Sequence, residues 1–174
     1  MRPILFTLLV VNILSLLKIG DAALTYYLLQ TGAFVELNPF VKTGSFTSIL
    51  LSPIPMLIFS VGVFCAGLGS FVASAINAGV INNPILIRLD KSIGLHFICA
   101  EAISICFLVA LFYSFAVLNN FLGVVVGFTI IDLATAFESR VVTILLCIFL
   151  VLAIFPIDRF LYKISSKICK RMTT

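Results

Sequence analysis

The sequence predicts an all-α integral membrane protein with four transmembrane helices plus a short helical segment that is re-entrant or buried. Of its 174 residues, 62% are hydrophobic and only 10% are charged, whereas soluble domains carry about 25% charged residues. Several apolar runs also exceed the roughly 20 residues that a helix needs to cross about 30 Å of hydrocarbon. No stretch outside these runs is long enough for a soluble domain, so we expect one membrane domain over residues 1–174.

The four expected spans are the longest apolar runs, at about residues 4–29, 53–78, 92–118 and 141–161. The first run continues unbroken to Leu29, which favours a retained helix over a cleaved signal. The second run opens with Pro53 and Pro55, which the first turn of a helix tolerates. Residues 121–137 are also apolar, but this segment is short and Asp132 interrupts it. We therefore expect it to enter the membrane without crossing.

The distribution of Lys and Arg favours four spans over five. With four spans, eight basic residues lie on the cytoplasmic side: Arg2, Arg88, Lys91, Arg159, Lys163, Lys167, Lys170 and Arg171. Two lie outside, Lys42 and Arg140. A fifth span would place the N-terminus and the loop at 88–91 outside, against the positive-inside rule. The sequence thus predicts a multi-pass inner-membrane protein with both termini in the cytoplasm.

A thread of polar residues begins inside the first span and continues into the loop after it. Its members are Lys18, Asp21, Thr25, Gly32, Glu36, Asn38 and Pro39. The residues at 18, 21 and 25 share one helix face, so Lys18 and Asp21 can pair. Charge inside a membrane is costly and usually faces a protein interior or a water-filled cavity. Together with Glu101 and Asp132, this thread is the candidate intramembrane site, with either a structural role or a role in moving protons or ions.

Small residues recur along the second span and once more near residue 125. The stripe consists of Gly62, Ala66, Ser70, Ser74 and Ala78, and the later pattern is Gly123 and Gly127. Small side chains at a spacing of four residues let helix backbones approach closely. These residues are therefore the predicted helix-packing interface. The pattern fits packing within one chain and also self-association, and we expect a homo-oligomer.

The C-terminal stretch, residues 157–174, is basic and amphipathic. Apolar side chains at 157, 160, 161, 164 and 168 oppose basic ones. The basic residues expected to contact lipid or a partner are Arg88, Lys91, Arg159, Lys163, Lys167, Lys170 and Arg171. Such a surface can lie on anionic lipid. It is also the most plausible contact for a soluble cytoplasmic protein partner.

Enzyme chemistry, cofactors and metals are not expected. The chain has five cysteines without a CxxC pair and a single histidine, His96, which is too few ligands for most metal sites. Two intramembrane aspartates could form a catalytic dyad, but the flanking motifs of aspartyl proteases are missing. The basic residues follow the cytoplasmic loops and form no nucleic-acid-binding motif. We therefore predict no catalytic residues, no cofactor and no direct nucleic-acid binding.

The spacing Asp21-x3-Thr25-x6-Gly32-x3-Glu36-Leu37-Asn38-Pro39 resembles a motif of small, uncharacterised prokaryotic membrane proteins. In that family a helix bearing an aspartate leads into an ELNP turn. The match covers about the first quarter of the chain. The resemblance implies that these residues form one structural site, and it carries no activity.

The function expected from the sequence is that of a non-enzymatic, oligomeric membrane subunit. Such a subunit would serve sensing, anchoring or regulation of a partner protein, for example in a bacterial defence or stress system. The alternative is a small ion or proton channel or transporter that uses the intramembrane charges.

Overall fold

The computed structural model describes residues 2–32, 45–79, 83–127, 157 and 159–173. Within these ranges the helices are α1 (Pro3–Gln30), α2 (Phe46–Leu50), α3 (Pro53–Asn77), α4 (Pro84–Ser92) and α5 (Leu95–Val126). A further helix over residues 159–173 is called the C-terminal helix below. Among the described helices, three are long and apolar enough to cross a membrane, namely α1, α3 and α5. The chain is thus a helical multi-pass membrane protein, and most of the predicted fourth span, 141–161, lies outside the described residues.

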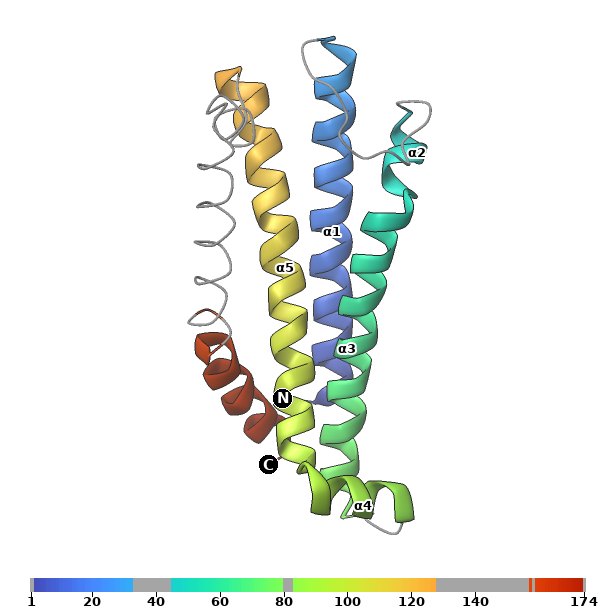
Figure 1. Cartoon of the computed structure of the whole chain (residues 1–174), viewed down its shortest axis with the longest axis vertical. Coiled ribbons are helices and arrows are strands. Elements are labelled where there is room, and N and C mark those ends of the chain that lie inside the picture. Colours follow the sequence, from blue (N-terminus) through green and yellow to red (C-terminus); the bar gives the residue numbers. More distant parts are fainter. Residues whose placement is uncertain (1, 33–44, 80–82, 128–156, 158, 174) are drawn as a thin grey trace, which may run out of the picture.

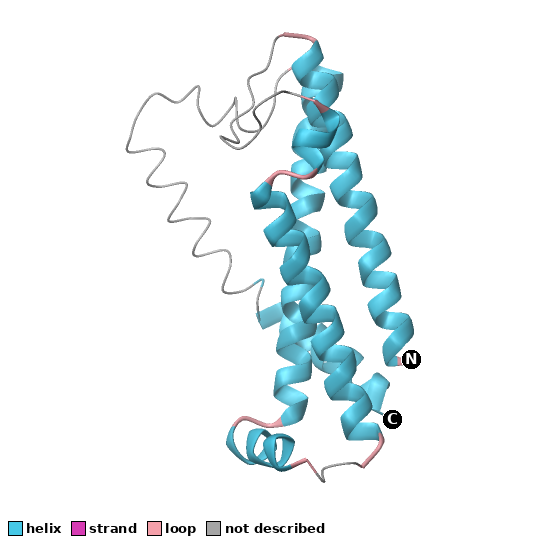
Figure 2. Cartoon of the chain, turned by 90° about the vertical axis from the view of Figure 1, so that its right-hand side faces the viewer, coloured by secondary structure: helices cyan, strands magenta, loops and turns pink. Residues whose placement is uncertain are grey.

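The helices α1, α3 and α5 run side by side as a bundle, with α3 antiparallel to the other two (Figure 1). The short helix α2 precedes α3 at one end, which we call the upper end. The helix α4 lies across the opposite, lower end, and both termini lie toward that end (Figure 2). The two predicted spans at 4–29 and 53–78 match α1 and α3 closely.

Helix boundaries follow from prolines and side-chain caps. Pro3 and Pro53 open α1 and α3, where a missing backbone N–H costs nothing. The side chain of Asn83 accepts a hydrogen bond from the backbone N–H of Ile85 at 2.9 Å and so caps α4. The carboxylate of Asp90 accepts one from the backbone N–H of Leu95, also at 2.9 Å. This last bond fixes the corner between α4 and α5. The loop predicted at 88–91 is therefore part of the helix α4.

The helix α5 extends beyond the predicted end of the third span. It continues through Asn119 and Asn120 to Val126, whereas the sequence predicted an end at 118 and a separate segment over 121–137. That boundary was wrong because the two amides find partners inside the bundle, so they do not interrupt the helix. Gly127 ends α5 with a left-handed φ of 81°, a conformation that suits glycine. Of the predicted glycine pair, Gly123 is buried in the bundle and Gly127 is the cap.

The small-residue stripe of α3 packs inside the chain. A Cβ atom added to Gly62 would lie 2.7 Å from Leu14 Cδ1 and 3.0 Å from Val109 Cγ1. At Gly69 it would lie 3.2 Å from a side-chain carbon of Ile103. The buried members of α3 are Gly62, Cys65, Ala66, Gly69, Ser70, Val72 and Ala73. Gly62, Ala66 and Ser70 of the stripe thus pack within the chain, whereas Ser74 and Ala78 are exposed.

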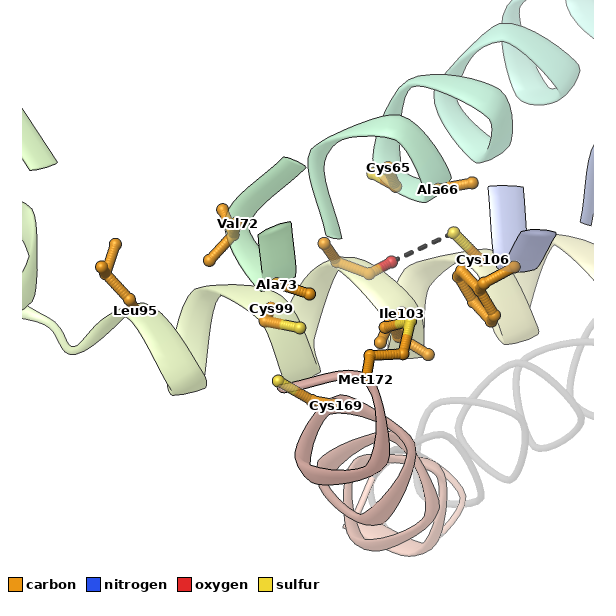
Figure 3. Packing of buried hydrophobic residues seen from close by; sticks show 12 residues of the cluster. Cys65, Ala66, Val72, Ala73, Leu95, Cys99, Ile103, Cys106, Cys169 and Met172 are labelled. Carbon is orange, nitrogen blue, oxygen red and sulfur yellow. Dashed lines mark hydrogen bonds between the residues drawn. The ribbon is translucent and has the colours of Figure 1, made fainter. Parts of the chain in front are cut away.

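The C-terminal helix packs against the lower part of the bundle. Its buried side chains recur at three- and four-residue spacing: Leu161, Ser165, Cys169 and Met172. Figure 3 shows Cys169 and Met172 pointing toward α5, and the Asn77 side chain of α3 donates a hydrogen bond to the Met172 carbonyl at 2.6 Å. Of the predicted apolar side chains, Leu161 is buried in the protein, whereas Ile157 and Phe160 are exposed. The basic side chains Arg159, Lys163, Lys167, Lys170 and Arg171 are also exposed.

Candidate functional site

Polar side chains join all three pairs of long helices in the upper half of the bundle. This polar cluster consists of Lys18, Asp21, Thr25, Tyr113, Asn119 and Asn120. It lies where α1 and α5 approach their C-terminal ends and where α3 begins. Because polar groups in an apolar bundle need partners within the protein, the contacts of each side chain determine what the cluster can do.

The amide of Asn120 connects α5 to α1. Its Nδ2 donates to Asp21 Oδ1 at 2.8 Å and to Thr25 Oγ1 at 2.9 Å. Its Oδ1 accepts a hydrogen bond from the amide of Asn119 at 3.3 Å. An amide nitrogen carries two hydrogens, so both donations are possible at once. A single side chain of α5 thus holds the carboxylate of Asp21 and the hydroxyl of Thr25, which lie one turn apart on α1.

The ammonium group of Lys18 connects α1 to α3. Only 7% of the residue is exposed. Its Nζ lies 2.6 Å from the thioether sulfur of Met56 and 5.0 Å from the ring centroid of Phe59. A thioether is a weak acceptor, and the ring supplies a cation–π contact. Within the described ranges no carboxylate forms an ion pair with this lysine.

The expected pairing of Lys18 with Asp21 is therefore not formed. Three residues along a helix correspond to about 300° of rotation, so the two side chains point about 60° apart. In this bundle that angle is enough to direct Lys18 toward α3 and Asp21 toward α5. The third connection, between α5 and α3, is the hydroxyl of Tyr113, which donates to the carbonyl of Pro55 at 2.6 Å.

An apolar layer lies directly below the polar cluster. Leu14, one turn before Lys18, is fully buried, and it packs with Val109 against Gly62. Nearer the lower end, the hydroxyls of Thr7 and Ser70 lie 2.6 Å apart. The apolar layer separates this hydroxyl pair from the polar cluster. In the described part of the bundle, polar groups thus do not form a continuous path from one end to the other.

The structure brings together only some of the residues predicted for the site. Lys18, Asp21 and Thr25 belong to the cluster, but Glu101 lies 19 residues before Asn120 on α5, about 28 Å along the helix axis. Glu36, Asn38 and Asp132 lie outside the described residues.

Sequence reasoning missed three members of the cluster, which are Tyr113, Asn119 and Asn120. Two adjacent amides within a strongly apolar helix were the available signal, because unpaired amides in hydrocarbon are costly.

The chemistry that the described side chains of the cluster offer is hydrogen bonding and charge. Among the described residues, no group of three or more His, Cys, Asp or Glu side chains could hold a metal ion. The cluster holds one ammonium group and one carboxylate on the same helix, each turned to a different neighbour. A small movement of α1 against α3 or α5 would therefore change the surroundings of one charge without the other.

No protein-family model matches the chain, and comparisons with curated proteins and with solved structures find no significant match.

Replacing Asn120 with leucine tests whether its amide holds α1 against α5. We expect Asn120→Leu to lower the free energy of unfolding in detergent by about 1–2 kcal/mol, because the partners of a lost buried hydrogen bond stay desolvated. Asn12→Leu is the matched control, since the exposed Asn12 amide bonds only to the carbonyl of Leu8 in its own helix. Equal effects of the two substitutions would show that the bonds to Asp21 and Thr25 do not stabilise the bundle.

Proposed function

We propose that the chain is a non-enzymatic membrane subunit that regulates or anchors a cytoplasmic partner protein. In this proposal the polar cluster is the sensing site, and the C-terminal helix is the surface that contacts the partner. One setting for such a subunit is a bacterial defence or stress system of the inner membrane. We further propose that copies of the chain associate through lipid-facing surfaces that the bundle leaves exposed.

The observation that carries this proposal is the apolar layer beneath the polar cluster. Leu14 and Val109 pack so closely on Gly62 that even a methyl group would not fit without movement. A conducting protein needs polar groups or water along its whole path. A regulatory subunit needs only a polar site that is coupled to another surface through rigid helices, and packed helices transmit displacement well.

The C-terminal helix supplies a surface for a partner at the lower end. It is held by the hydrogen bond from Asn77 to the Met172 carbonyl and by its buried face. Lys163 and Lys167 lie on its exposed face, and Lys91 of α4 is exposed at the same end of the bundle. A docked helix loses little freedom on binding, which favours association. Its charge favours an acidic partner.

Charge reversal on the C-terminal helix tests the partner-binding proposal. We expect the double variant Lys163→Glu, Lys167→Glu to reduce recovery of a co-purifying soluble protein by about tenfold, a change of about 1.4 kcal/mol in binding. The double variant Lys163→Arg, Lys167→Arg keeps the charge and should recover the partner as the unaltered chain does. The measurement is quantitative mass spectrometry of the native complex. Equal recovery by the charge-reversed variant, or no partner with any variant, would contradict the proposal.

The second candidate function is transport of protons or ions. It is favoured by Lys18, an almost fully buried ammonium group whose described neighbours are a thioether and an aromatic ring. Burial of a charge in such surroundings is costly, and intramembrane lysines often mark transport pathways. In this reading the Leu14 layer would be a closed gate.

Flux measurements in proteoliposomes separate the two functions. We expect the unaltered chain and the Leu14→Ala variant to pass protons and monovalent cations no faster than empty vesicles, because only part of the path is polar. The Asp21→Asn variant tests whether any flux that does occur depends on the Asp21 carboxylate. Flux through the unaltered chain that rises in Leu14→Ala and disappears in Asp21→Asn would establish the transport function instead.

A further inference from the structure

We propose that Cys99 and Cys169 form an oxidisable thiol pair that reacts with hydroperoxides and, as a disulfide, fastens the C-terminal helix to α5. This inference does not depend on the identity of the partner or on the proposed function of the polar cluster. It concerns the lower end of the bundle, where two cysteines far apart in the sequence meet.

The two thiols come from different helices and face each other. Figure 3 shows Cys169 pointing from the C-terminal helix toward Cys99 on α5, and both residues belong to the same buried cluster. The Cys99 thiol itself donates a hydrogen bond to the backbone carbonyl of Gly69 at 3.6 Å. Both residues are buried, with exposed fractions of 0% and 1%. A disulfide can form only between two cysteine side chains that point toward each other. Cys99 and Cys169 have this orientation.

A histidine at the surface of the protein lies beside the pair. His96 precedes Cys99 by one helical turn and is exposed. Its Nδ1 lies 3.8 Å from the Cys169 sulfur, and its backbone carbonyl lies 3.9 Å from the same atom. His96 is the single histidine of the chain. The pair is thus buried by the docking of one helix, and an exposed imidazole lies next to it.

These neighbours make Cys169 the reactive member of the pair. The neighbouring thiol of Cys99 lowers the pKa of the Cys169 thiol below its usual range, and the imidazole of His96 acts in the same direction. The thiolate is the form of cysteine that attacks peroxides. By contrast, the thiol of Cys106 lies two turns further along α5 and bonds to the backbone carbonyls of Gly62 and Ala102.

The reaction consists of two steps, in which one peroxide oxidises both thiols. The Cys169 thiolate attacks one oxygen of hydrogen peroxide, the O–O bond breaks, and hydroxide leaves as a sulfenic acid forms on Cys169. Hydroxide takes up a proton and becomes water. The sulfur of Cys99 then attacks the Cys169 sulfur, the S–O bond breaks, and the leaving oxygen departs as a second water with the Cys99 proton. Two thiols are oxidised to one disulfide, and one peroxide is reduced to two waters.

The disulfide would change the mobility of the C-terminal helix. In the reduced state the described contacts that hold this helix are non-covalent, namely its buried face and the Asn77 hydrogen bond. The disulfide would add a covalent link between positions 99 and 169. In a reducing compartment such a link forms transiently and is reversed by cellular thiols, as is usual for redox-sensing pairs.

Peptide mapping after oxidation tests the thiol pair. The full chain in lipid vesicles is treated with hydrogen peroxide, blocked with an alkylating agent, digested without reductant and examined by mass spectrometry. We expect one cross-linked species that joins the Cys99 and Cys169 peptides, with loss of both free thiols and their return after reduction. A dominant link between any other two cysteines, or oxidation that leaves Cys169 unmodified, would overturn the proposal.

Two variants sharpen this test. In Cys99→Ser the reaction should stop at the first step, so that dimedone, which traps sulfenic acids, labels Cys169. In Cys106→Ser, a buried cysteine outside the pair, the link between Cys99 and Cys169 should form as it does in the unaltered chain. Loss of the link in Cys106→Ser, or absence of dimedone label in Cys99→Ser, would also contradict the proposed order of reaction.

Discussion

The close approach of α3 to α1 and α5 at Gly62 is the constraint on which the bundle depends. At this position the Cδ1 atom of Leu14 and the Cγ1 atom of Val109 occupy the space that a side chain would fill. Without a hydrophobic driving force between helices in lipid, such close packing is what holds them together. It also creates the apolar layer that divides the bundle into an upper polar part and a lower part lined by small residues and thiols.

Two regions of different chemistry follow from this division. Above the layer, the carboxylate of Asp21 accepts a hydrogen bond from the Asn120 amide across the interface between α1 and α5. Below the layer, small residues on α3 bring its backbone close enough for the thiols of Cys99 and Cys106 to reach the carbonyls of Gly69 and Gly62. The C-terminal helix then covers this lower region. A polar site and a docked basic helix thus share one rigid set of helices, which is the basis of the regulatory proposal.

Hydropathy and proline placement predicted α1 and α3 closely, because span length and first-turn prolines are local properties of the sequence. The contacts between helices were not predictable in this way. Whether Lys18 meets Asp21 or Met56 depends on a rotation of about 60°, and the periodicity of one helix does not show where its neighbours lie. The same reason explains why the amide of Asn120 was missed. The terminal helix buries Ser165 and exposes Phe160, because the surface that it meets decides its buried face.

The most direct test of this account compares leucine at two glycines of α3. An added Cβ meets two side chains at Gly62 but has nothing within 4 Å at Gly67. The measurement is the free energy of unfolding of each variant in detergent micelles. We predict that Gly62→Leu lowers this free energy by about 1–3 kcal/mol through overpacking and that Gly67→Leu leaves it unchanged or raises it. Equal stability of the two variants would contradict the claim that close packing at Gly62 holds the bundle together.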